Sequence, residues 1–284
     1  IETITILKDA AAASIWGARA GNGVIVITTK KGKVNQRMNI ELNANTTIIG
    51  KPDLYYLPKA STSDFIDVER FLFSKGKYDA AISDIYTYPA ISPVVSILLK
   101  ERNGEITGEE ASKQIDNLRA IDNREELLKK NYRNSISQQY SINVSGGSPS
   151  MNYYFSAGYD ETMGALEERS RRITLRSENS FRPAKGLEVG IGIAYMMGYN
   201  SGARFPGAPS RYPYERMYDD AGNPVTITGS FRQEFLDMVK NNGLLDWSLN
   251  PVVEAKLNKE NGTINEARVS PTITYRFSKN LSAQ

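Results

Sequence analysis

The residue types that most often carry out catalysis are missing from this chain. Its 284 residues include no histidine and no cysteine, which excludes cysteine nucleophiles, histidine general bases, zinc sites built from His and Cys, and disulfides. The charge is nearly balanced, with 35 Lys and Arg against 32 Asp and Glu. A net charge of +3 does not argue for a nucleic acid as a partner.

Carboxylates are plentiful, but their spacing does not indicate catalysis or metal binding. Asp219 and Asp220 begin the run Asp-Asp-Ala-Gly-Asn-Pro. They could bind calcium there, but the spacing of an EF-hand is absent and the run is typical of a turn. A glycosidase needs two carboxylates across a cleft, and no such pair stands out. We therefore expect no catalytic residue, no metal site and no cofactor.

Aromatic and guanidinium groups offer a different chemistry, which is binding. Arg211, Tyr212, Tyr214 and Trp247 lie in a long segment rich in proline and turn residues. Aromatic rings stack on sugar faces, and Arg and Tyr are enriched at interface hot spots. These four residues are our candidates for contacts with a ligand or a partner. The alternative is that the rings pack this segment against itself.

The first 33 residues predict a strand, a short helix, a turn and a second strand. Ile4 and Ile6 alternate with threonines, as in a half-buried strand. Asp9 precedes four alanines as a helix N-cap would, and Gly17 ends that helix. The run Gly-Asn-Gly at 21–23 is a tight turn, and the β-branched run after it is typical of a buried strand.

This order resembles the end of the plug domain of TonB-dependent outer-membrane transporters. Four stretches are similar to the SusC/RagA branch of that family: Leu7-Lys8-Asp9-Ala10-Ala11-Ala12, Trp16-Gly17-Ala18-Arg19, Asn22-Gly23-Val24-Ile25 and Thr28-Thr29-Lys30-Lys31-Gly32. The family usually has Tyr at the position of Trp16, a conservative departure. The resemblance implies a structural plug motif made of Asp9, Trp16, Gly17, Arg19 and Gly23. An ordinary βαβ unit is the alternative.

Alternation of apolar and polar residues predicts strands in the rest of the chain. It occurs in segments 39–45, 138–147, 152–160, 172–181, 187–199 and 268–277. The clearest has Val189, Ile191 and Ile193 on one face, which we expect to meet lipid. Gly190 and Gly192 lie on the other face, where another backbone could approach closely. That neighbour could be the plug.

Connections between these strands follow the order long, short, medium, short, long, short. The long ones, 46–133 and 200–267, contain helical patterns at 64–75, 109–121, 124–132 and 230–241, and Pro89 and Pro93 indicate an irregular segment. Outer-membrane barrels have short periplasmic turns and longer extracellular loops. We therefore expect both long connections to lie outside the cell.

The resemblance implies a mainly β fold, namely a plugged antiparallel transmembrane β-barrel of about 22 strands. About seven strand segments are present here, with helices in the long extracellular loops. Residues 1–33 would be the C-terminal part of the plug, and residues 34–284 the N-terminal part of the barrel. No apolar run approaches the roughly 18 residues of a transmembrane helix, and we expect an internal piece of a longer chain.

The resemblance also implies a function, which is TonB-dependent active import of glycan or peptide nutrients across the outer membrane of a Gram-negative bacterium. The implied partners are a SusD-like surface lipoprotein, TonB through a segment outside this sequence, the glycan or peptide cargo, and outer-membrane lipid. No nucleic acid and no enzymatic activity are expected. A non-transporting barrel (a porin or an adhesin) is one alternative, but it does not explain residues 1–33, because such a barrel needs no plug. An extracellular β-rich glycan-binding or hydrolytic protein is another alternative, but it does not explain why the strands have one apolar and one polar face.

Overall fold

The computed structural model describes residues 2–7, 17, 23–203, 210–278 and 281–284. Its strands form two sheets. The smaller one pairs β1 (Thr3–Leu7) with β2 (Val24–Thr28) in antiparallel fashion. The larger one is an antiparallel meander of seven strands, each beside its neighbour in sequence: β3 (Asn39–Ile49), β4 (Ser135–Gly147), β5 (Met151–Met163), β6 (Arg169–Ala184), β7 (Leu187–Ala203), β8 (Lys259–Arg276) and β9 (Ser282–Ala283).

The predicted alternation is confirmed, and it gives the large sheet two chemically different faces. One cross-strand row of what we call the apolar face runs through Leu42, Ile142, Ala157, Leu175 and Tyr195. A neighbouring row, on what we call the polar face, runs through Glu41, Asn143, Ser156, Arg176, Ala194 and Arg268. Because successive side chains of a strand point to opposite faces, each strand contributes to both.

The strands run further into the long connections than the sequence pattern predicted. β3 continues to Ile49, and β7 and β8 stay paired up to Ala203 and Lys259. The predicted boundaries at 46, 200 and 267 are therefore wrong by several residues. Residues 259–267 are mostly polar on both faces, so they show no alternation, and the backbone ladder to β7 holds them in the sheet.

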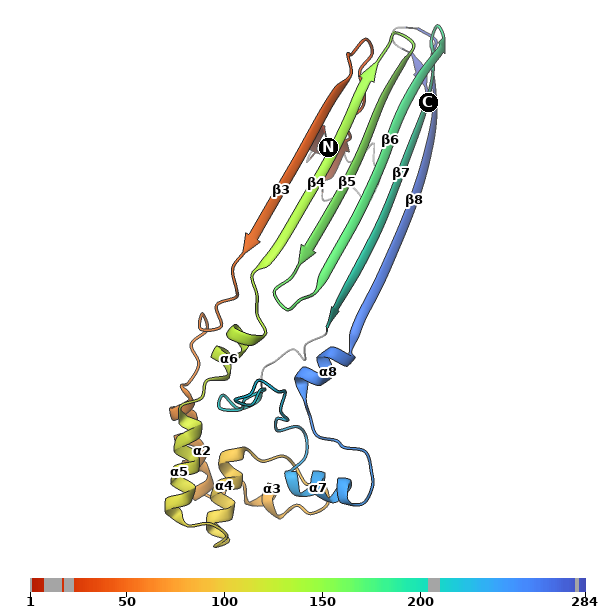
Figure 1. Cartoon of the computed structure of the whole chain (residues 1–284). Helices are drawn as coiled ribbons and strands as arrows, with labels where there is room; N and C mark the ends of the chain where they lie inside the picture. The colour runs from red at the N-terminus through yellow and green to blue at the C-terminus, as the bar shows by residue number, and fades with distance from the viewer. Residues whose placement is uncertain (1, 8–16, 18–22, 204–209, 279–280) are drawn as a thin grey trace.

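The two long connections leave the same end of the sheet and fold together there, beside the β5–β6 turn, while the β4–β5 and β6–β7 turns lie at the opposite end (Figure 1). We call residues 50–134 and 210–258 the loop domain. The helices of its first part are α2 (Thr62–Ser74), α3 (Asp79–Ser83), α4 (Pro93–Arg102), α5 (Gly108–Arg119) and α6 (Asn123–Lys130). Its second part contains α7 (Gln233–Asn241) and α8 (Pro251–Leu257).

Helices α2, α5, α6 and α7 confirm the predicted helical patterns, whereas α3, α4 and α8 were not predicted. Two of the missed helices begin with proline. Ser92 caps α4 by accepting a 3.1 Å hydrogen bond from the Val95 amide, and Pro93 follows at the first helical position. Asn250 caps α8 in the same way ahead of Pro251. Proline at that position starts a helix because its missing N–H has no helical partner to lose.

Nearly all buried apolar side chains belong to the loop domain. One cluster contains Ile66, Val94, Leu98, Ile115 and Tyr214, and a second contains Leu127, Met217 and Val252. The apolar face of the sheet is uncovered by contrast, with Leu42 75% exposed and Val269 62% exposed. An apolar surface of this extent is typical of a face that meets lipid or another protein.

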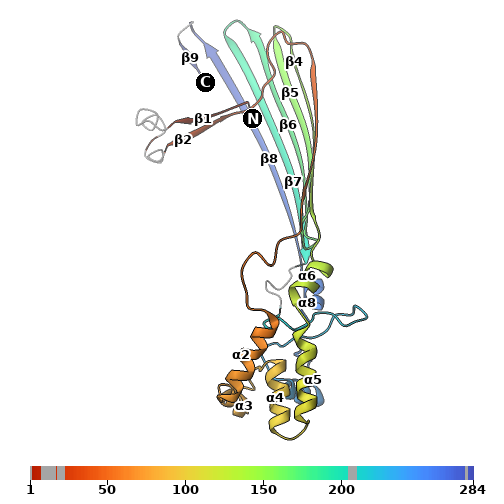
Figure 2. The same ribbon diagram turned by 90° about the vertical axis from the view of Figure 1, so that its left-hand side faces the viewer.

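The β1–β2 hairpin stands off one side of the large sheet (Figure 2). The segment that follows β2 leads from this hairpin to β3. Among the described residues, no helix is long and apolar enough to cross a membrane.

Candidate functional site

Residues 29–36, which we call the tether, are bound to the polar face of the sheet. Arg176, in the middle of β6, donates a 2.7 Å hydrogen bond from Nη2 to Oγ1 of Thr29. The same guanidinium group pairs with Glu178 at 2.7 Å. At the edge of the sheet, Lys30 forms a 3.0 Å ion pair with Glu41 of β3. The polar face thus supplies charged and polar partners to the chain that follows the hairpin.

Further contacts join the tether to the β4–β5 hairpin. Asn152 Nδ2 donates a hydrogen bond to the Gly32 carbonyl oxygen, and the Gly147 amide donates to the Gln36 carbonyl at 2.9 Å. A Cβ atom on Gly32 would lie 2.8 Å from the Gly146 carbonyl oxygen, which is too close for any side chain. Gly32 therefore allows direct contact between two backbones, the tether and the sheet.

The small residues of β7 lie near this contact, although the closest approach is elsewhere. Gly190 and Gly192 line a cavity of about 270 Å³ together with Lys31 and Gly32 of the tether. The tightest backbone contact is on β4 and β5, at Gly32. The two glycines instead make room for neighbouring side chains, since a Cβ on Gly192 would lie 2.9 Å from a Glu178 carboxylate oxygen.

Only part of the predicted plug motif falls within the described residues. Gly17 and Gly23 have φ values of +77° and +96°, in the region that favours glycine. Asp9, Trp16 and Arg19 lie outside the described residues. The helix cap at Asp9 and the anchoring role of Arg19 remain predictions.

A second cavity, of about 710 Å³, opens where the strands meet the loop domain. Thr162, Ser170 and Asn200 line it and share one row of the polar face. Glu168 and Glu260 add carboxylates. These groups can accept and donate hydrogen bonds to a polar ligand. The sequence analysis did not predict this site, because its residues belong to five strands, β4 to β8, and to the β5–β6 turn, which only the register brings together.

Tyr214 lies in the core of the loop domain. It is 1% exposed and packs with Ile66 and Ile115 from the other long connection. Its hydroxyl group donates a 2.6 Å hydrogen bond to Oε2 of Glu69, which is 4% exposed. Burial raises the pKa of the Glu69 carboxyl, and the hydrogen bond from Tyr214 opposes that effect. This placement corresponds to the alternative in which the ring packs the segment against itself.

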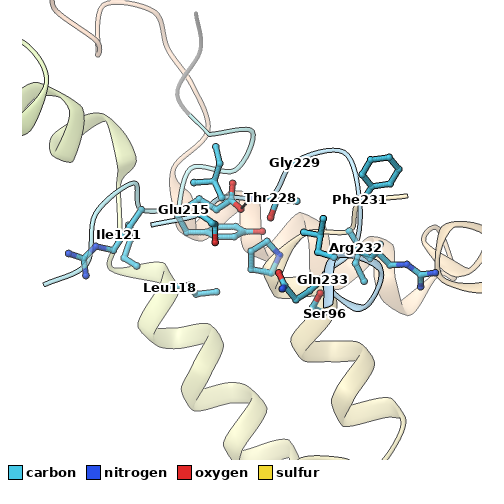
Figure 3. Close-up of a pocket in the computed structure, with 16 residues that line it drawn as sticks. Ser96, Leu118, Ile121, Glu215, Thr228, Gly229, Phe231, Arg232 and Gln233 are labelled. Atoms are coloured by element: carbon cyan, nitrogen blue, oxygen red, sulfur yellow. Dashed lines mark hydrogen bonds between the residues drawn. The ribbon is translucent and has the colours of Figure 1, made fainter. Parts of the chain in front are cut away.

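Figure 3 shows a cavity of about 410 Å³ between the two parts of the loop domain. Leu118 and Ser96 border it from α5 and α4, and Glu215 and Thr228 border it from the second connection. Glu215 is 7% exposed, and it accepts a 2.7 Å hydrogen bond from the Thr228 amide and another from the Ser210 hydroxyl. Its carboxylate is thus occupied in holding the second connection in place.

Besides Tyr214, the sequence analysis proposed three residues for contacts with a ligand or partner, and these three differ in exposure. Trp247 is 53% exposed and rests against Phe231 and Phe235, with ring centroids 5.8 and 5.9 Å away. Tyr212 is half-buried and stacks on Tyr214 at 5.8 Å, while Arg211 is exposed. In this conformation Arg211 and Trp247 are the two of the four that are most accessible to a ligand or partner. Their role in binding remains a prediction.

Asp219 and Asp220 make contacts within the turn that contains them. Asp219 Oδ1 accepts a 2.7 Å hydrogen bond from the Asn223 amide, and Asp220 pairs with Arg216 at 2.6 Å. These contacts are those of a structural turn. Among the described residues, no group of three or more Asp, Glu, His or Cys is placed to hold a metal ion.

Comparison with curated proteins finds relatives over most of the chain. The TonB-dependent receptor SusC of Bacteroides thetaiotaomicron is 24% identical over 292 aligned residues, which include 98% of this chain and 25% of SusC. The TonB-dependent receptor P39 of Formosa agariphila is 25% identical over 231 residues, with 79% of this chain and 19% of P39 covered. The chain thus spans about a quarter of the length of SusC and less of P39. No family model matches it.

Solved structures share the fold. The RagAB peptide importer in its closed-closed state matches with a TM-score of 0.65 and 20% identity, covering 98% of this chain and 30% of that one. A structure of the RagAB peptide transporter gives a TM-score of 0.66 and 21% identity, covering 98% and 31%. The fold class is therefore that of a plugged antiparallel barrel, and the open sheet seen here is one portion of its wall.

Proposed function

We propose, on the premise that this chain is a SusC/RagA-like part of a TonB-dependent receptor, that the whole receptor actively imports glycan or peptide nutrients across the outer membrane of a Gram-negative bacterium. In this proposal residues 1–33 end the plug, and residues 34–284 form the first strands of the barrel. Energy reaches the plug from TonB through a segment outside this sequence.

The observation that carries the proposal is the attachment of the tether to the polar face. A plugged transporter needs a domain inside the barrel that stays joined to the wall. The hydrogen bonds from Arg176 to Thr29 and from Asn152 to Gly32 join the tether, which follows the β1–β2 hairpin, to the polar face of the sheet. This attachment supports an orientation in which the polar face lines the lumen and the apolar face meets lipid.

The loop domain would lie outside the cell, where a SusD-like surface lipoprotein and the cargo meet the receptor. The 710 Å³ cavity, with its hydroxyl, amide and carboxylate groups, lies at the same end of the strands. Arg211 and Trp247 are the exposed candidates for contact with either of them. SusC is a TonB-dependent receptor and RagAB is a peptide importer, and the uptake experiment below decides between glycan and peptide cargo.

Uptake by the complete receptor tests the function. A strain that lacks the receptor gene is complemented with the full gene, and accumulation of fluorescent oligosaccharides and oligopeptides is measured with and without an uncoupler of the proton gradient. We expect one of the two cargo classes to accumulate only in complemented, energised cells. Equal uptake after uncoupling would favour a porin, and no uptake of either class would favour an adhesin or a glycan-binding protein.

Labelling of whole cells tests the topology separately. This chain has no cysteine, so once any cysteine elsewhere in the receptor is replaced by serine, a single substitution gives a unique site for a membrane-impermeant maleimide. Leu245, which is 83% exposed, reports on the loop domain, and the exposed Lys185 reports on a short turn. We expect labelling of the Leu245→Cys receptor and none of the Lys185→Cys receptor until the cells are lysed. The reverse pattern would remove the proposed extracellular binding face.

A further inference from the structure

The apolar face of the sheet carries two arginines, and both are at the end near the loop domain. Arg169 and Arg171 belong to β6 and alternate with residues of the polar face. They therefore point to the same side as Leu175, which lines an apolar surface groove together with Tyr159 and Ile173. In the proposed membrane orientation, these two arginines project from the outside of the barrel at its extracellular rim.

One carboxylate lies between the two guanidinium groups. Arg171 Nε donates a 3.0 Å hydrogen bond to Oε1 of Glu161, and Arg169 Nε lies 3.6 Å from the same oxygen. The Tyr159 hydroxyl donates to the other Glu161 oxygen at 3.0 Å. Two positive charges thus share one negative charge. Among the described residues, none accepts a hydrogen bond from the Nη atoms of either arginine, whose side chains are 39% and 43% exposed.

The opposite end of the same face has a different chemistry. The last residues there to point outward are Met151, Phe181, Leu187 and Tyr275, and none of them is a lysine or an arginine. Positive charge on the lipid side is therefore confined to one rim of these strands. An asymmetry of this kind matches a membrane whose two leaflets present different headgroups.

We propose that Arg169 and Arg171, held by Glu161 and Tyr159, bind a phosphate group of the phosphorylated glycolipid in the outer leaflet, the lipid A portion of lipopolysaccharide. Guanidinium groups match phosphate oxygens in paired hydrogen bonds. Tyrosine at the membrane interface places the cluster at headgroup depth. Glu161 uses the Nε atoms and leaves the Nη atoms for the phosphate. This inference rests on the proposed function, because it needs the loop domain outside the cell.

Native mass spectrometry of the detergent-extracted full receptor tests the proposal. The probes are lipid A, chemically dephosphorylated lipid A and phosphatidylglycerol, each titrated against the wild-type receptor, the R169Q/R171Q receptor and the R172Q receptor. Arg172 is the matched control, because it neighbours Arg171 in β6 but pairs with Asp160 at 2.8 Å on the polar face.

We expect at least a tenfold loss of lipid A affinity in R169Q/R171Q, none in R172Q, and weak binding of dephosphorylated lipid A to all three receptors. Equal lipid A binding by wild type and R169Q/R171Q overturns the proposal, as does an equal loss in R172Q. Preference of the wild type for phosphatidylglycerol would assign the cluster to an ordinary anionic phospholipid and also overturn it. Surface labelling of the Leu245→Cys receptor separates these outcomes from a failure of the proposed function, because that labelling does not depend on the arginines.

Discussion

Arg176 Nη2 donates a 2.7 Å hydrogen bond to Thr29 Oγ1, which joins the middle of β6 to the residue directly after β2, 147 positions earlier. Arg176 also pairs with Glu178, so one side chain neutralises an acid of the polar face and holds the tether. In the proposed receptor this bond is a point at which the plug is fixed to the barrel wall.

Loss of this bond should loosen the plug. In the Arg176→Ala receptor the tether loses a charge-assisted hydrogen bond, and Glu178 loses its ion-pair partner. We expect higher permeability of the outer membrane to a large antibiotic such as vancomycin, measured as a lower inhibitory concentration. The control is Arg268→Ala, which removes a 70% exposed side chain from the same row of the sheet. Equal sensitivity of the two variants would show that Arg176 does not hold the plug.

A charged side chain on the apolar face should destabilise the receptor in a bilayer. Ile193 points outward in mid-strand and is 44% exposed. In the full receptor, Ile193→Arg should cost about 2–4 kcal/mol of folding free energy in a bilayer, measured by reversible unfolding in urea, and Val189→Arg and Ile191→Arg should cost similar amounts. Thr274→Arg is the control, because Thr274 pairs with Glu188 on the polar face and a positive charge is tolerated there. Near-zero costs at all three outward sites would contradict a lipid-facing sheet.

The Tyr214 hydroxyl should stabilise the loop domain. Tyr214→Phe keeps the packing against Ile66 but leaves the buried Glu69 carboxyl without its 2.6 Å donor. We expect a loss of about 1–3 kcal/mol, measured as the opening free energy from hydrogen exchange of amides in α2 and α4. Tyr86→Phe, at a 92% exposed ring, should have no effect. A similar loss in both variants would mean that the buried hydrogen bond contributes nothing specific.

The loop domain should also be less stable at higher pH. Burial raises the pKa of Glu69 in the folded state above the ordinary 4.5. At a pH between the ordinary pKa of the unfolded chain and the raised pKa of the folded form, the folded form holds a proton that the unfolded chain has released. The stability is therefore greatest at low pH and falls as the pH rises through the folded pKa. Glu69→Gln removes this titration. In the same exchange measurement between pH 4.5 and 8, the wild type should weaken with pH more than the variant does, and parallel curves would contradict the assignment to Glu69.

Patterns local to one element could be predicted from the sequence. Alternation in 187–199 placed Val189, Ile191 and Ile193 on one face, and the spacing in 64–75 and 109–121 located α2 and α5. These predictions succeeded because such a pattern records the environment along a single strand or helix. They failed where both faces are polar, as in residues 259–267, or where a proline starts a helix instead of breaking one, as at Pro93.

By itself, then, the sequence determined the strands of the large sheet, four of its connecting helices, the two faces of the sheet and the similarity of residues 1–33 to a plug. The tertiary structure decided which distant residues meet. Tyr214 was predicted as a binding residue and lies in the core, because α2 and α5 of the other connection enclose it. No sequence pattern predicted that Arg171 and Glu161 would pair, because only the register of β5 against β6 sets them opposite each other. Local periodicity reports how an element is solvated, whereas contacts between segments depend on packing and register, which no local pattern encodes.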